Sequence, residues 1–570
     1  MVASILPFLS VLADTEAIRT TEWLSWAYDA FGFQSDYAFL VALGIGSLAV
    51  ILFSFAMQIL NIYVSLRFAV DRIPSMSKKL LEGYLGQNYD YFLQNNSSVF
   101  STRVLSEVTE MVTRVLLPTT ELIAAALTIL ALLALLTVVN PVVTVAVFGL
   151  MAVSFGGTFI ASRVKLNQLG ERRVQQNSAR YRAVAEAFGG IKEIKLLGRE
   201  QSYIDRYHSA ASGMADSMIK TQLLSQTPYF TIQAVALGGV IALCLVLVDP
   251  AGMAENSALV TLLPLLGVFA FAGQRMLPEL GKLYQSVAKI QSAKAAINVV
   301  YDDLVEARDA AVGASSVTTP QIHLRRGLEF SNVTYRYPGS RHAGVFDIDL
   351  AIASGEKIGI VGGTGAGKTT LADLVLGLLL PQSGTVTVDD TPIERSNVRG
   401  WQKSVGYVPQ DIFLSDSSIA ENIALGLGKD EIDFAQVEAA ARAAQIETFI
   451  LEELPEGYDT FVGERGVRLS GGQRQRIGIA RALYHRAELI VFDEATSALD
   501  NMTEAEVIAA IDSLPGDKTV MMIAHRLSTV KACDRIVVME RGRIVGCDTW
   551  STLMAGNPAF QRIAQLGEVR

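Results

Sequence analysis

The sequence predicts an all-α transmembrane domain fused to an α/β domain. Long runs without Asp, Glu, Lys or Arg occur only in the first half of the chain, whereas after residue 323 short β-branched runs alternate with helical stretches. A chain of 570 residues also exceeds what one hydrophobic core usually supports. We expect the transmembrane domain at residues 1–303, a small and polar linker at residues 304–320, and the α/β domain at residues 321–570.

Four uncharged runs predict five membrane spans. A helix of about 20 apolar residues crosses a bilayer core of roughly 30 Å, and each run is long enough to do so once. The second run is long enough for two helices, and Asn140-Pro141 near its middle predicts the turn between them, because proline lacks the N–H that a continuing helix would use. Buried helices of a large soluble protein are the alternative, but such helices seldom run so far without a charge. The runs occupy residues 37–66, 122–162, 221–248 and 256–274.

The stretch MVASILPFLSVLA at residues 1–13 predicts part of a sixth span, the first in the chain. It is uncharged, but at 1.5 Å per residue it reaches only about 20 Å. A secretory signal would begin with basic residues, and none precedes Arg19. We therefore expect six helices per chain, the first of them truncated because residues are missing upstream of Met1.

The loops between the runs predict the orientation. Residues 67–114 and 163–220 are long and rich in Arg and Lys, whereas residues 14–36 and 249–255 are short and mostly acidic. Positive charge favours the cytoplasmic side, so we expect the long loops and the α/β domain in the cytoplasm. The net charge of -9 argues against a nucleic-acid partner, and three scattered cysteines are too few for a disulfide framework or a metal site.

The first outer loop contains TEWLSWAYDAFGF at residues 21–33. Trp23, Trp26, Ala27, Ala30 and Phe31 share one face of a helix built from this stretch. The pattern predicts either a short amphipathic helix at the membrane surface or ordinary packing against the spans, and it does not decide between them.

The α/β domain contains a predicted phosphate loop. The stretch GGTGAGKT at residues 362–369 matches G-x-x-x-x-G-K-[ST] and lies between a predicted strand at residues 357–361 and a predicted helix at residues 369–380. Glycines let backbone N–H groups curl round phosphates, and the helix N-terminus adds positive potential. We expect Lys368 to reach the β- and γ-phosphates and the Thr369 hydroxyl to bind Mg²⁺. The predicted ATP-binding residues of this segment are Gly362, Thr364, Gly365, Ala366, Gly367, Lys368, Thr369 and Thr370.

A second strand, ELIVFDE at residues 488–494, ends in two acids. We expect Asp493 to hold Mg²⁺ through water, and Glu494 to orient and deprotonate the water that attacks the γ-phosphate. His525 follows a strand-like run at residues 519–524, which places its imidazole near the same phosphate. The predicted catalytic residues are Glu494, His525 and Lys368.

Another glycine-rich stretch, LSGGQ, precedes a helix predicted at residues 474–485 and supplies a second helix N-terminus for anionic oxygens. One nucleotide cannot easily occupy two such cradles within a single domain. The residues of this stretch are therefore expected to complete the ATP site of a second copy of the chain: Ser470, Gly471, Gly472 and Gln473.

These motifs together resemble those of the ATP-binding cassette proteins. The resemblance rests on LSGGQ, the phosphate loop, Gln410 in VPQD, FDE and a late histidine, and it covers the whole chain, because a membrane domain followed by one cassette is similar to a half-transporter of the exporter type. It implies a P-loop NTPase domain, a homodimer with two hydrolysing sites, ATP and Mg²⁺ as cofactors, and a bacterial inner membrane.

The resemblance also assigns further residues. It implies that Tyr337 stacks on adenine, that Gln410 couples Mg²⁺ to the membrane domain, that Asp500 lies at the dimer seam, and that GERG at residues 463–466 signals between subunits. Short coupling helices are implied near residues 88–93 and 200–207. ATP would close the cassettes, closure would push these helices, and hydrolysis would let the dimer reopen.

The cargo is predicted from weaker signals. Residues 80–108 and 186–200 look similar to bacterial flippases for lipid-linked oligosaccharides, a family in which an interfacial helix between spans one and two contributes to flipping. Arg275 lies at the edge of the last span, where it could meet the pyrophosphate of a polyprenyl-linked sugar. A snorkelling or helix-capping arginine is the alternative. The family's other cavity arginines are absent, and Tyr229 stands where a basic residue is expected.

Three functions remain open from the sequence. The first is an ATP-driven flippase that moves a lipid-linked oligosaccharide or related anionic glycolipid outward. The second is a multidrug, peptide or lipid exporter with the same machinery. The third is an ATP-gated channel or regulator that does not pump, and the intact hydrolytic residues argue against it. We expect the first.

Overall fold

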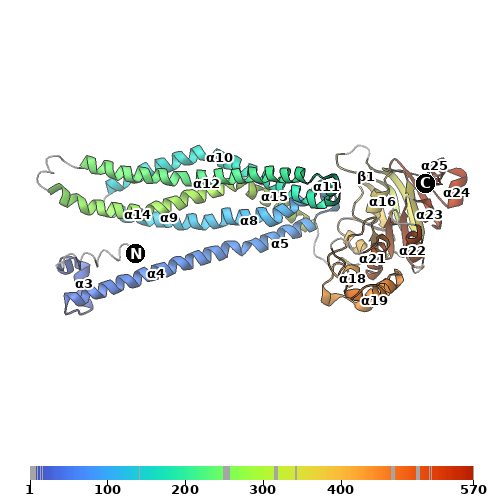
Figure 1. Cartoon of the computed structure of the whole chain (residues 1–570), viewed down its shortest axis with the longest axis horizontal. Helices are drawn as coiled ribbons and strands as arrows, with labels where there is room; N and C mark the ends of the chain where they lie inside the picture. Colours follow the sequence, from blue (N-terminus) through green and yellow to red (C-terminus); the bar gives the residue numbers. More distant parts are fainter. Residues whose placement is uncertain are drawn as a thin grey trace. The chain divides into compact units, whose positions relative to one another are not determined.

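Long helices build the first of the two units into which the chain divides, and two β-sheets with surrounding helices build the second (Figure 1). The first unit comprises Met1–Gly86 and Asn95–Asp309, and the second comprises Gln87–Gln94 and Ala310–Arg570. The computed structural model describes residues 8–568 except residues 9–10, 13–14, 16, 140, 248–256, 314–318, 340–342, 464–468, 496–500, 513, 515 and 525. Most of the first predicted span therefore lies outside the described residues.

Five long helices contain the five predicted spans. They are α4 (Asp36–Val70), α9 (Leu117–Val139), α10 (Pro141–Gly189), α12 (Glu200–Leu247) and α14 (Ser257–Ser292). The break predicted at Asn140-Pro141 is confirmed, because α9 ends before it and Pro141 opens α10, a position where its missing N–H has no intrahelical partner to lose. In Figure 1, α10 runs beside α12 and α9 beside α14, and these pairs pack together.

Shorter helical segments connect the long ones. They are α2 (Ala17–Thr20), α3 (Glu22–Ala30), α5 (Arg72–Leu85), α7 (Ser97–Thr102), α8 (Val108–Met111), α11 (Ile191–Leu197) and α15 (Lys294–Gly313), with two π-helical turns, η1 (Arg103–Glu107) and η2 (Val112–Leu116). Helix α15 continues ten residues into the segment that the sequence predicts as a linker from residue 304, so that part is helical.

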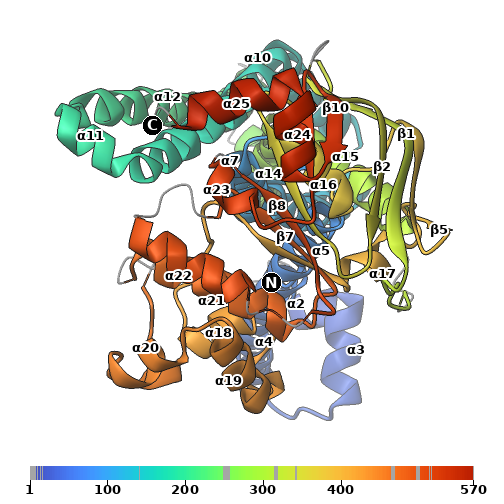
Figure 2. The same cartoon turned by 90° about the vertical axis from the view of Figure 1, so that its right-hand side faces the viewer.

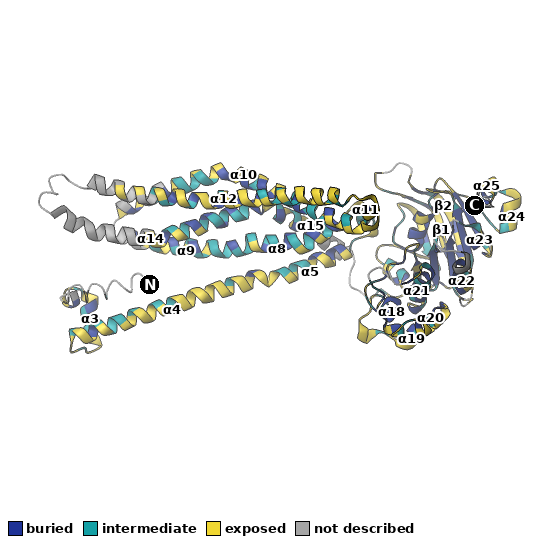
Figure 3. Ribbon diagram, viewed as in Figure 1, coloured by how far each residue is buried: buried dark blue, intermediate teal, exposed yellow. Residues whose placement is uncertain are grey.

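Most residues of α4 are exposed (Figure 3), and many of these exposed residues are large and apolar. Phe53 and Ile59, for example, are 68% and 69% exposed. By length and composition, two described stretches can cross a membrane, Asp36–Leu85 and Ser97–Ala134, and few of their residues are buried. A helix that is apolar on every face needs lipid or protein around it, so α4 has the surface expected of a membrane helix.

Helix α3 only partly packs against the rest of the helical unit. Leu24 is buried in a cluster with Val11, Ile18 and Phe39, and Ala27 lies against that cluster. On the predicted aromatic face, Trp23 and Trp26 are 51% and 70% exposed. The helix therefore has one buried apolar face and one exposed aromatic face. This pattern is expected of a helix at a membrane surface.

Two short helices lie where the chain turns between long helices. Helix α6 (Tyr89–Gln94) agrees with the first coupling helix implied near residues 88–93. The second expectation, near residues 200–207, is wrong in position, because those residues form the first turns of α12 and the short helix is α11. Gly190 and Gly198 bound α11, and Gly198 takes the left-handed conformation (φ +60°) that ends a helix.

Two sheets organise the second unit. One is antiparallel, in the order β2-β1-β4-β5, and the other is mainly parallel, in the order β10-β9-β3-β8-β7-β6. In the larger sheet, β3, β6, β7, β8 and β9 are parallel and only β10 is antiparallel. The strands are β1 (Gly327–Arg336), β2 (Gly344–Ala353), β3 (Lys357–Gly362), β4 (Ser383–Val388), β5 (Thr391–Pro392), β6 (Val405–Val408), β7 (Leu489–Asp493), β8 (Thr519–Ile523), β9 (Arg535–Glu540) and β10 (Arg543–Asp548).

Both faces of the larger sheet are covered by a hydrophobic core. Along β7, Leu489 and Val491 face the core shared with the antiparallel sheet, while Ile490 and Phe492 face the core shared with α18 to α22. Figure 2 shows these helices grouped apart from β1, β2 and β5. The helices are α16 (Lys368–Val375), α17 (Val398–Gln402), α18 (Ile419–Ile423), α19 (Phe434–Ala443), α20 (Glu447–Glu452), α21 (Gly471–Tyr484), α22 (Asn501–Asp512), α23 (Leu527–Val530), α24 (Trp550–Gly556) and α25 (Pro558–Glu568), with short turns η3 (Lys429–Glu431) and η4 (Gly457–Asp459).

Candidate nucleotide-binding site

The predicted ATP-site segments meet at one edge of the larger sheet. The phosphate loop follows β3, Gln410 follows β6, and Asp493 and Glu494 stand at the end of β7. Since these strands are parallel, their carboxyl ends share that edge. Ligands of open α/β sheets bind in the crevice outside the carboxyl ends of the strands.

The phosphate loop has a backbone that glycine makes possible. Gly365 and Gly367 have φ values of +77° and +99°, in the left-handed region that residues with a Cβ rarely adopt. A Cβ on Gly362 would lie 2.5 Å from the carbonyl oxygen of Met539. The loop is tied further by the Ala366 carbonyl, which accepts a hydrogen bond of 2.9 Å from the Gly542 N–H. These constraints turn the loop tightly before Lys368 begins α16.

Lys368 is buried against the loop that precedes it. Its Nζ donates to the carbonyl oxygens of Gly362 at 2.9 Å and Gly363 at 3.3 Å, and the residue is 7% exposed. Burial lowers the pKa of its ammonium, and the nearby carboxylates of Glu494 and Asp493 act in the opposite direction. The Lys368 ammonium therefore lies near both predicted acidic residues, Asp493 and Glu494, at the carboxyl end of the sheet.

The two acids at the end of β7 are held by neighbouring strands. The Tyr407 hydroxyl, from β6, donates to Oδ2 of Asp493 at 3.3 Å. Glu494 has φ +52°, an unusual value for a residue with a side chain, and its N–H donates to the Ile523 carbonyl of β8 at 2.9 Å. Backbone strain of this kind concentrates at functional sites. This strained residue follows directly after Asp493, at the carboxyl end of β7.

Oxygen ligands suited to magnesium are present at this edge. Among the described residues, no group of three or more His, Cys, Asp or Glu side chains could hold a metal ion. Magnesium bound to a nucleotide takes most of its ligands from phosphate and water, and needs only one or two protein carboxylates. Asp493 and the Thr369 hydroxyl fit that requirement. The exposed Gln410 lies beyond β6, and its carbonyl accepts a hydrogen bond of 2.8 Å from Nε2 of Gln475 in α21.

The LSGGQ stretch forms a capped helix start. The Ser470 hydroxyl accepts from the Gln473 N–H at 3.2 Å, and Oε1 of Gln473 accepts from the Ser470 N–H at 2.7 Å. The helix α21 begins at Gly471, so Gly471 and Gly472 supply first-turn N–H groups that have no partner inside the helix. This is the arrangement that binds anions at a helix N-terminus.

Tyr337 lies between the antiparallel sheet and the phosphate loop. Its hydroxyl accepts a hydrogen bond of 3.3 Å from Oγ1 of Thr370, and its ring meets Tyr335 edge-on with centroids 5.3 Å apart. Burial is the main reason that the pKa of Tyr337 is raised. The residue expected to contact adenine is thus fixed in position by a residue expected to contact phosphate.

Some predicted site residues lie elsewhere. His525 and Asp500 lie outside the described residues, as do residues 464–466 of the GERG stretch. Arg275 belongs to the first unit, where it is exposed on α14. The structure therefore brings together the phosphate loop, Tyr337, Gln410, Asp493 and Glu494 in the second unit, and places Arg275 in the helical unit.

Two residues near the site were missed by the sequence analysis. Tyr407 binds Asp493 as described, and its position in GYVPQ, at the end of a strand, is the signal that could have found it. Asp373 in α16 is 8% exposed, and burial, with smaller contributions from Asp493 and Asp90, raises its pKa to about 6. Nothing in the local sequence marks Asp373, since its surroundings come from distant segments.

Gly367→Ala is expected to weaken ATP binding roughly tenfold, because a left-handed alanine costs about 1–2 kcal/mol and the loop must shift. The added Cβ would also lie 3.0 Å from Cγ1 of Val345 and 3.1 Å from the Gly344 carbonyl. The dissociation constant of a fluorescent ATP analogue measures the effect. Gly363→Ala is the matched control, because its Cβ would meet nothing within 4 Å. Equal affinities for the two variants would contradict this account of the loop.

Comparison with known proteins identifies both parts of the chain. A family model described as ABC transporter matches residues 345–497, and one described as ABC transporter transmembrane region matches residues 4–269. Both matches fall on the parts that the sequence assigns to a cassette and to membrane spans.

Relatives and a solved structure match over most of their length. A protein named ATP-dependent lipid A-core flippase from Alkalilimnicola ehrlichii is 34% identical over 493 residues, which cover 85% of this chain and 80% of the relative. Its namesake from Thiobacillus denitrificans is 33% identical over 504 residues, covering 88% and 84%. A structure of a bacterial Atm1-family ABC exporter with ATP bound has a TM-score of 0.77 at 24% identity, covers 99% of this chain and 97% of its own, and shows the same fold.

The motifs, the arrangement of the sheet edge and these matches lead to one assignment. The chain has one transmembrane region and one ATP-binding region, in the order of an exporter half. The chain belongs to the ATP-binding cassette transporter family and is an ATP-hydrolysing half-transporter of the exporter type.

Proposed function

We propose that two copies of this chain form a homodimer in a bacterial inner membrane and use ATP hydrolysis to move a lipid-linked oligosaccharide or a related anionic glycolipid outward. The observation that supports the cargo most strongly is the name shared by the relatives, ATP-dependent lipid A-core flippase, at 33–34% identity over most of the chain. A lipid A-core is itself an anionic glycolipid, so these names favour the cargo class and leave the oligosaccharide carrier as the finer proposal.

The homodimer is supported by the capped start of α21 and by the surface of α11. Ser470, Gly471, Gly472 and Gln473 would complete the ATP site of the partner, with Asp500 at the seam between the two copies. Around α11, Phe188, Leu196 and Leu197 are 72%, 85% and 69% exposed. Large apolar side chains gathered at a helical turn mark a protein interaction surface, and a second copy would cover them.

The proposed hydrolysis uses the residues at the sheet edge. Tyr337 stacks on adenine, and the phosphate loop with Lys368 binds the phosphates. Thr369, Gln410 and Asp493 would hold Mg²⁺, which supplies positive charge next to the transferred phosphoryl group. Glu494 orients the attacking water and accepts its proton, and His525 contacts the γ-phosphate. The strained backbone at Glu494 supports this role, because such strain concentrates at functional sites.

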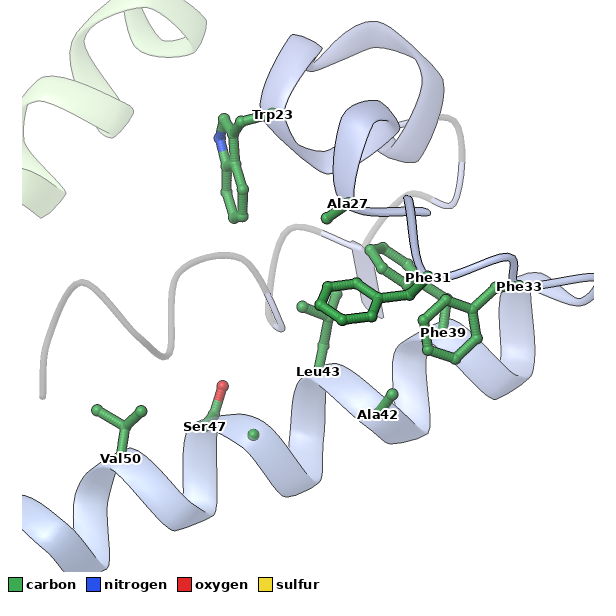
Figure 4. Close-up of a pocket in the computed structure, with 10 residues that line it drawn as sticks. Trp23, Ala27, Phe31, Phe33, Phe39, Ala42, Leu43, Ser47 and Val50 are labelled. Atoms are coloured by element: carbon green, nitrogen blue, oxygen red, sulfur yellow. The ribbon is translucent and has the colours of Figure 1, made fainter. Parts of the chain in front are cut away.

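An apolar hollow beside the outer helix supports a lipid cargo. It has a volume of about 480 Å³ and lies between α3 and the beginning of α4 (Figure 4). Figure 4 shows the rings of Phe31, Phe33 and Phe39 close together, with Trp23 across the hollow. An acyl or polyprenyl chain is long and apolar, so it matches this lining while a sugar headgroup would remain outside.

Outward movement is tested directly with the purified protein in liposomes that contain a fluorescent anionic glycolipid. The glycolipid starts in the leaflet that faces the ATP-binding domain. ATP should move the fluorophore to the other leaflet, where a quencher on that side can reach it. Transport of a cationic drug or a peptide with no movement of the glycolipid would replace the proposal by the exporter alternative.

Arg275→Ala is expected to reduce glycolipid movement by a factor of about 10 to 150, because a lost charge-assisted hydrogen bond to a phosphate costs about 1.5–3 kcal/mol. Arg275 is exposed on α14. Basal ATPase activity should stay within about twofold, as for most exposed substitutions. Arg182→Ala removes another exposed arginine, on α10, as the control. Equal transport by the two variants would remove Arg275 from the cargo site.

A further inference from the structure

The short helix α6 belongs to the nucleotide-binding unit although its neighbours in the sequence do not. The helices before and after it, α5 and α7, are part of the helical unit, whereas Gln87–Gln94 group with the second unit. The chain therefore leaves the helical unit, places six helical residues among those of the other unit, and returns. Any contact of α6 with the ATP site links that site to two membrane-connected helices.

One hydrogen bond attaches α6 to the antiparallel sheet. The Tyr335 hydroxyl donates to Oδ1 of Asp90 at 2.7 Å, across 245 residues of sequence. Tyr335 is 1% exposed, so its hydroxyl has been removed from bulk water and needs this acceptor. A hydrogen bond to an ionised carboxylate is stronger than one between neutral groups.

The same tyrosine contacts the predicted adenine position. The rings of Tyr335 and Tyr337 meet at 87° with centroids 5.3 Å apart, and the Tyr337 hydroxyl accepts from Thr370 of the phosphate-binding segment. Three consecutive contacts thus join Asp90 to Tyr335, Tyr335 to Tyr337, and Tyr337 to Thr370. Asp90 is also close enough to contribute to the raised pKa of Tyr337, after burial and nearer groups.

We propose that Asp90 and Tyr335 are positioning residues that transmit occupancy of the adenine position to α6. Adenine stacked on Tyr337 fixes that ring, the edge of the Tyr335 ring follows it, and the Tyr335 hydroxyl then holds the Asp90 carboxylate in one geometry. By linkage, α6 held in that geometry favours nucleotide binding to the same degree. The inference rests on the proposed contact of Tyr337 with adenine, and it does not depend on which cargo is transported.

The signal should depend on the adenine ring and not on phosphate alone. ADP supplies adenine without allowing hydrolysis, and tripolyphosphate supplies phosphates without adenine. In the full-length protein in lipid nanodiscs, saturating ADP with Mg²⁺ is expected to slow amide hydrogen exchange in peptides that cover residues 87–94 at least about fivefold, the lower end of typical coupling between sites. Tripolyphosphate should leave the exchange of these peptides unchanged.

Tyr335→Phe and Asp90→Ala each remove one partner of the hydrogen bond between Tyr335 and Asp90. In both variants ADP is expected to slow amide exchange of residues 87–94 by less than about twofold. The affinity for ADP should fall by no more than the factor by which this slowing is reduced. Tyr458→Phe is the matched control: this tyrosine is 5% exposed, its hydroxyl has no hydrogen-bond partner among the described residues, and its removal should leave the ADP effect intact.

An unchanged ADP effect in Asp90→Ala would overturn the proposal, as would an equal response of α6 to tripolyphosphate. Asp90 is half-buried on a short helix. Asp90→Ala should therefore leave the sheet intact and tests the proposal even if Tyr335→Phe disturbs β1. Failure of glycolipid transport would leave the ADP response unaltered, and the two proposals can therefore fail separately.

Discussion

Glu494→Gln is expected to lower the steady-state ATPase rate by a factor of about 10² to 10⁴, the range that a positioned general base contributes. The amide has the shape of the carboxylate but cannot accept the proton of the attacking water. The strained backbone of Glu494 and its N–H bond to Ile523 do not involve the side chain, so the turn after β7 should be preserved. ATP should still bind, since Lys368 and the phosphate loop are unaltered.

Phosphate release and ATP affinity are measured on the same preparation. The matched control is Glu540→Gln, since Glu540 is an exposed glutamate that ends β9, a strand parallel to β3 in the same sheet. A rate for Glu494→Gln within about tenfold of the unaltered protein would exclude Glu494 as the base, because the expected loss begins at 10². Glycolipid movement or an ionic current that persists in Glu494→Gln would favour a channel that does not pump.

Glu107→Leu is expected to destabilise the helical unit by about 3–5 kcal/mol, because it removes the nearer carboxylate of the buried Arg173 and leaves only Glu110, whose Oε1 lies 3.8 Å from Nη1 of Arg173. Glu107 and Arg173 are 1% and 4% exposed, and Nη2 of Arg173 lies 2.5 Å from Oε2 of Glu107. The other carboxylate oxygen, Oε1, accepts from Nδ2 of Asn177 at 2.9 Å. The network joins the π-helical turn η1 to α10, so its loss would also loosen the contact between the two helices.

An apparent melting temperature about 10 °C lower is the expected result in detergent, given 2–4 °C per kcal/mol for units of this size. The double variant Glu107→Leu with Arg173→Met removes both charges, and replacement of a buried pair by apolar residues of similar volume is often neutral. It should recover most of the lost stability. If the double variant is no more stable than Glu107→Leu alone, the unpaired charge of Arg173 is not the cause of the lost stability.

The parts of the molecule that follow from local sequence could be predicted from it. The turn at Asn140-Pro141 was predicted because proline ends a helix whatever surrounds it. The phosphate loop was predicted because its glycines and its flanking strand and helix lie within about twenty consecutive residues, as the motif requires. The predicted location of the second short helix was wrong, since the resemblance gave only an approximate place and the glycines at 190 and 198 bound the short helix α11.

Features that depend on distant contacts could not be predicted in this way. The pairing of Glu107 with Arg173 requires two helices, 66 residues apart in sequence, to present those positions to each other. The bond from Tyr335 to Asp90 spans 245 residues, and no periodicity in either segment indicates it. The left-handed conformation of Glu494 depends on the neighbouring strand β8, which supplies the Ile523 carbonyl. Composition and spacing contain no information about such partners.

The alternation along β7 has a consequence for how this domain can change over generations. Successive residues of this strand enter opposite cores, and the two acids follow directly at its end. A one-residue insertion or deletion within β7 would exchange the side chains between the two cores and move both acids relative to the phosphate loop. Such a change would damage folding and hydrolysis at once, so we expect β7 to tolerate substitutions far better than changes of its length.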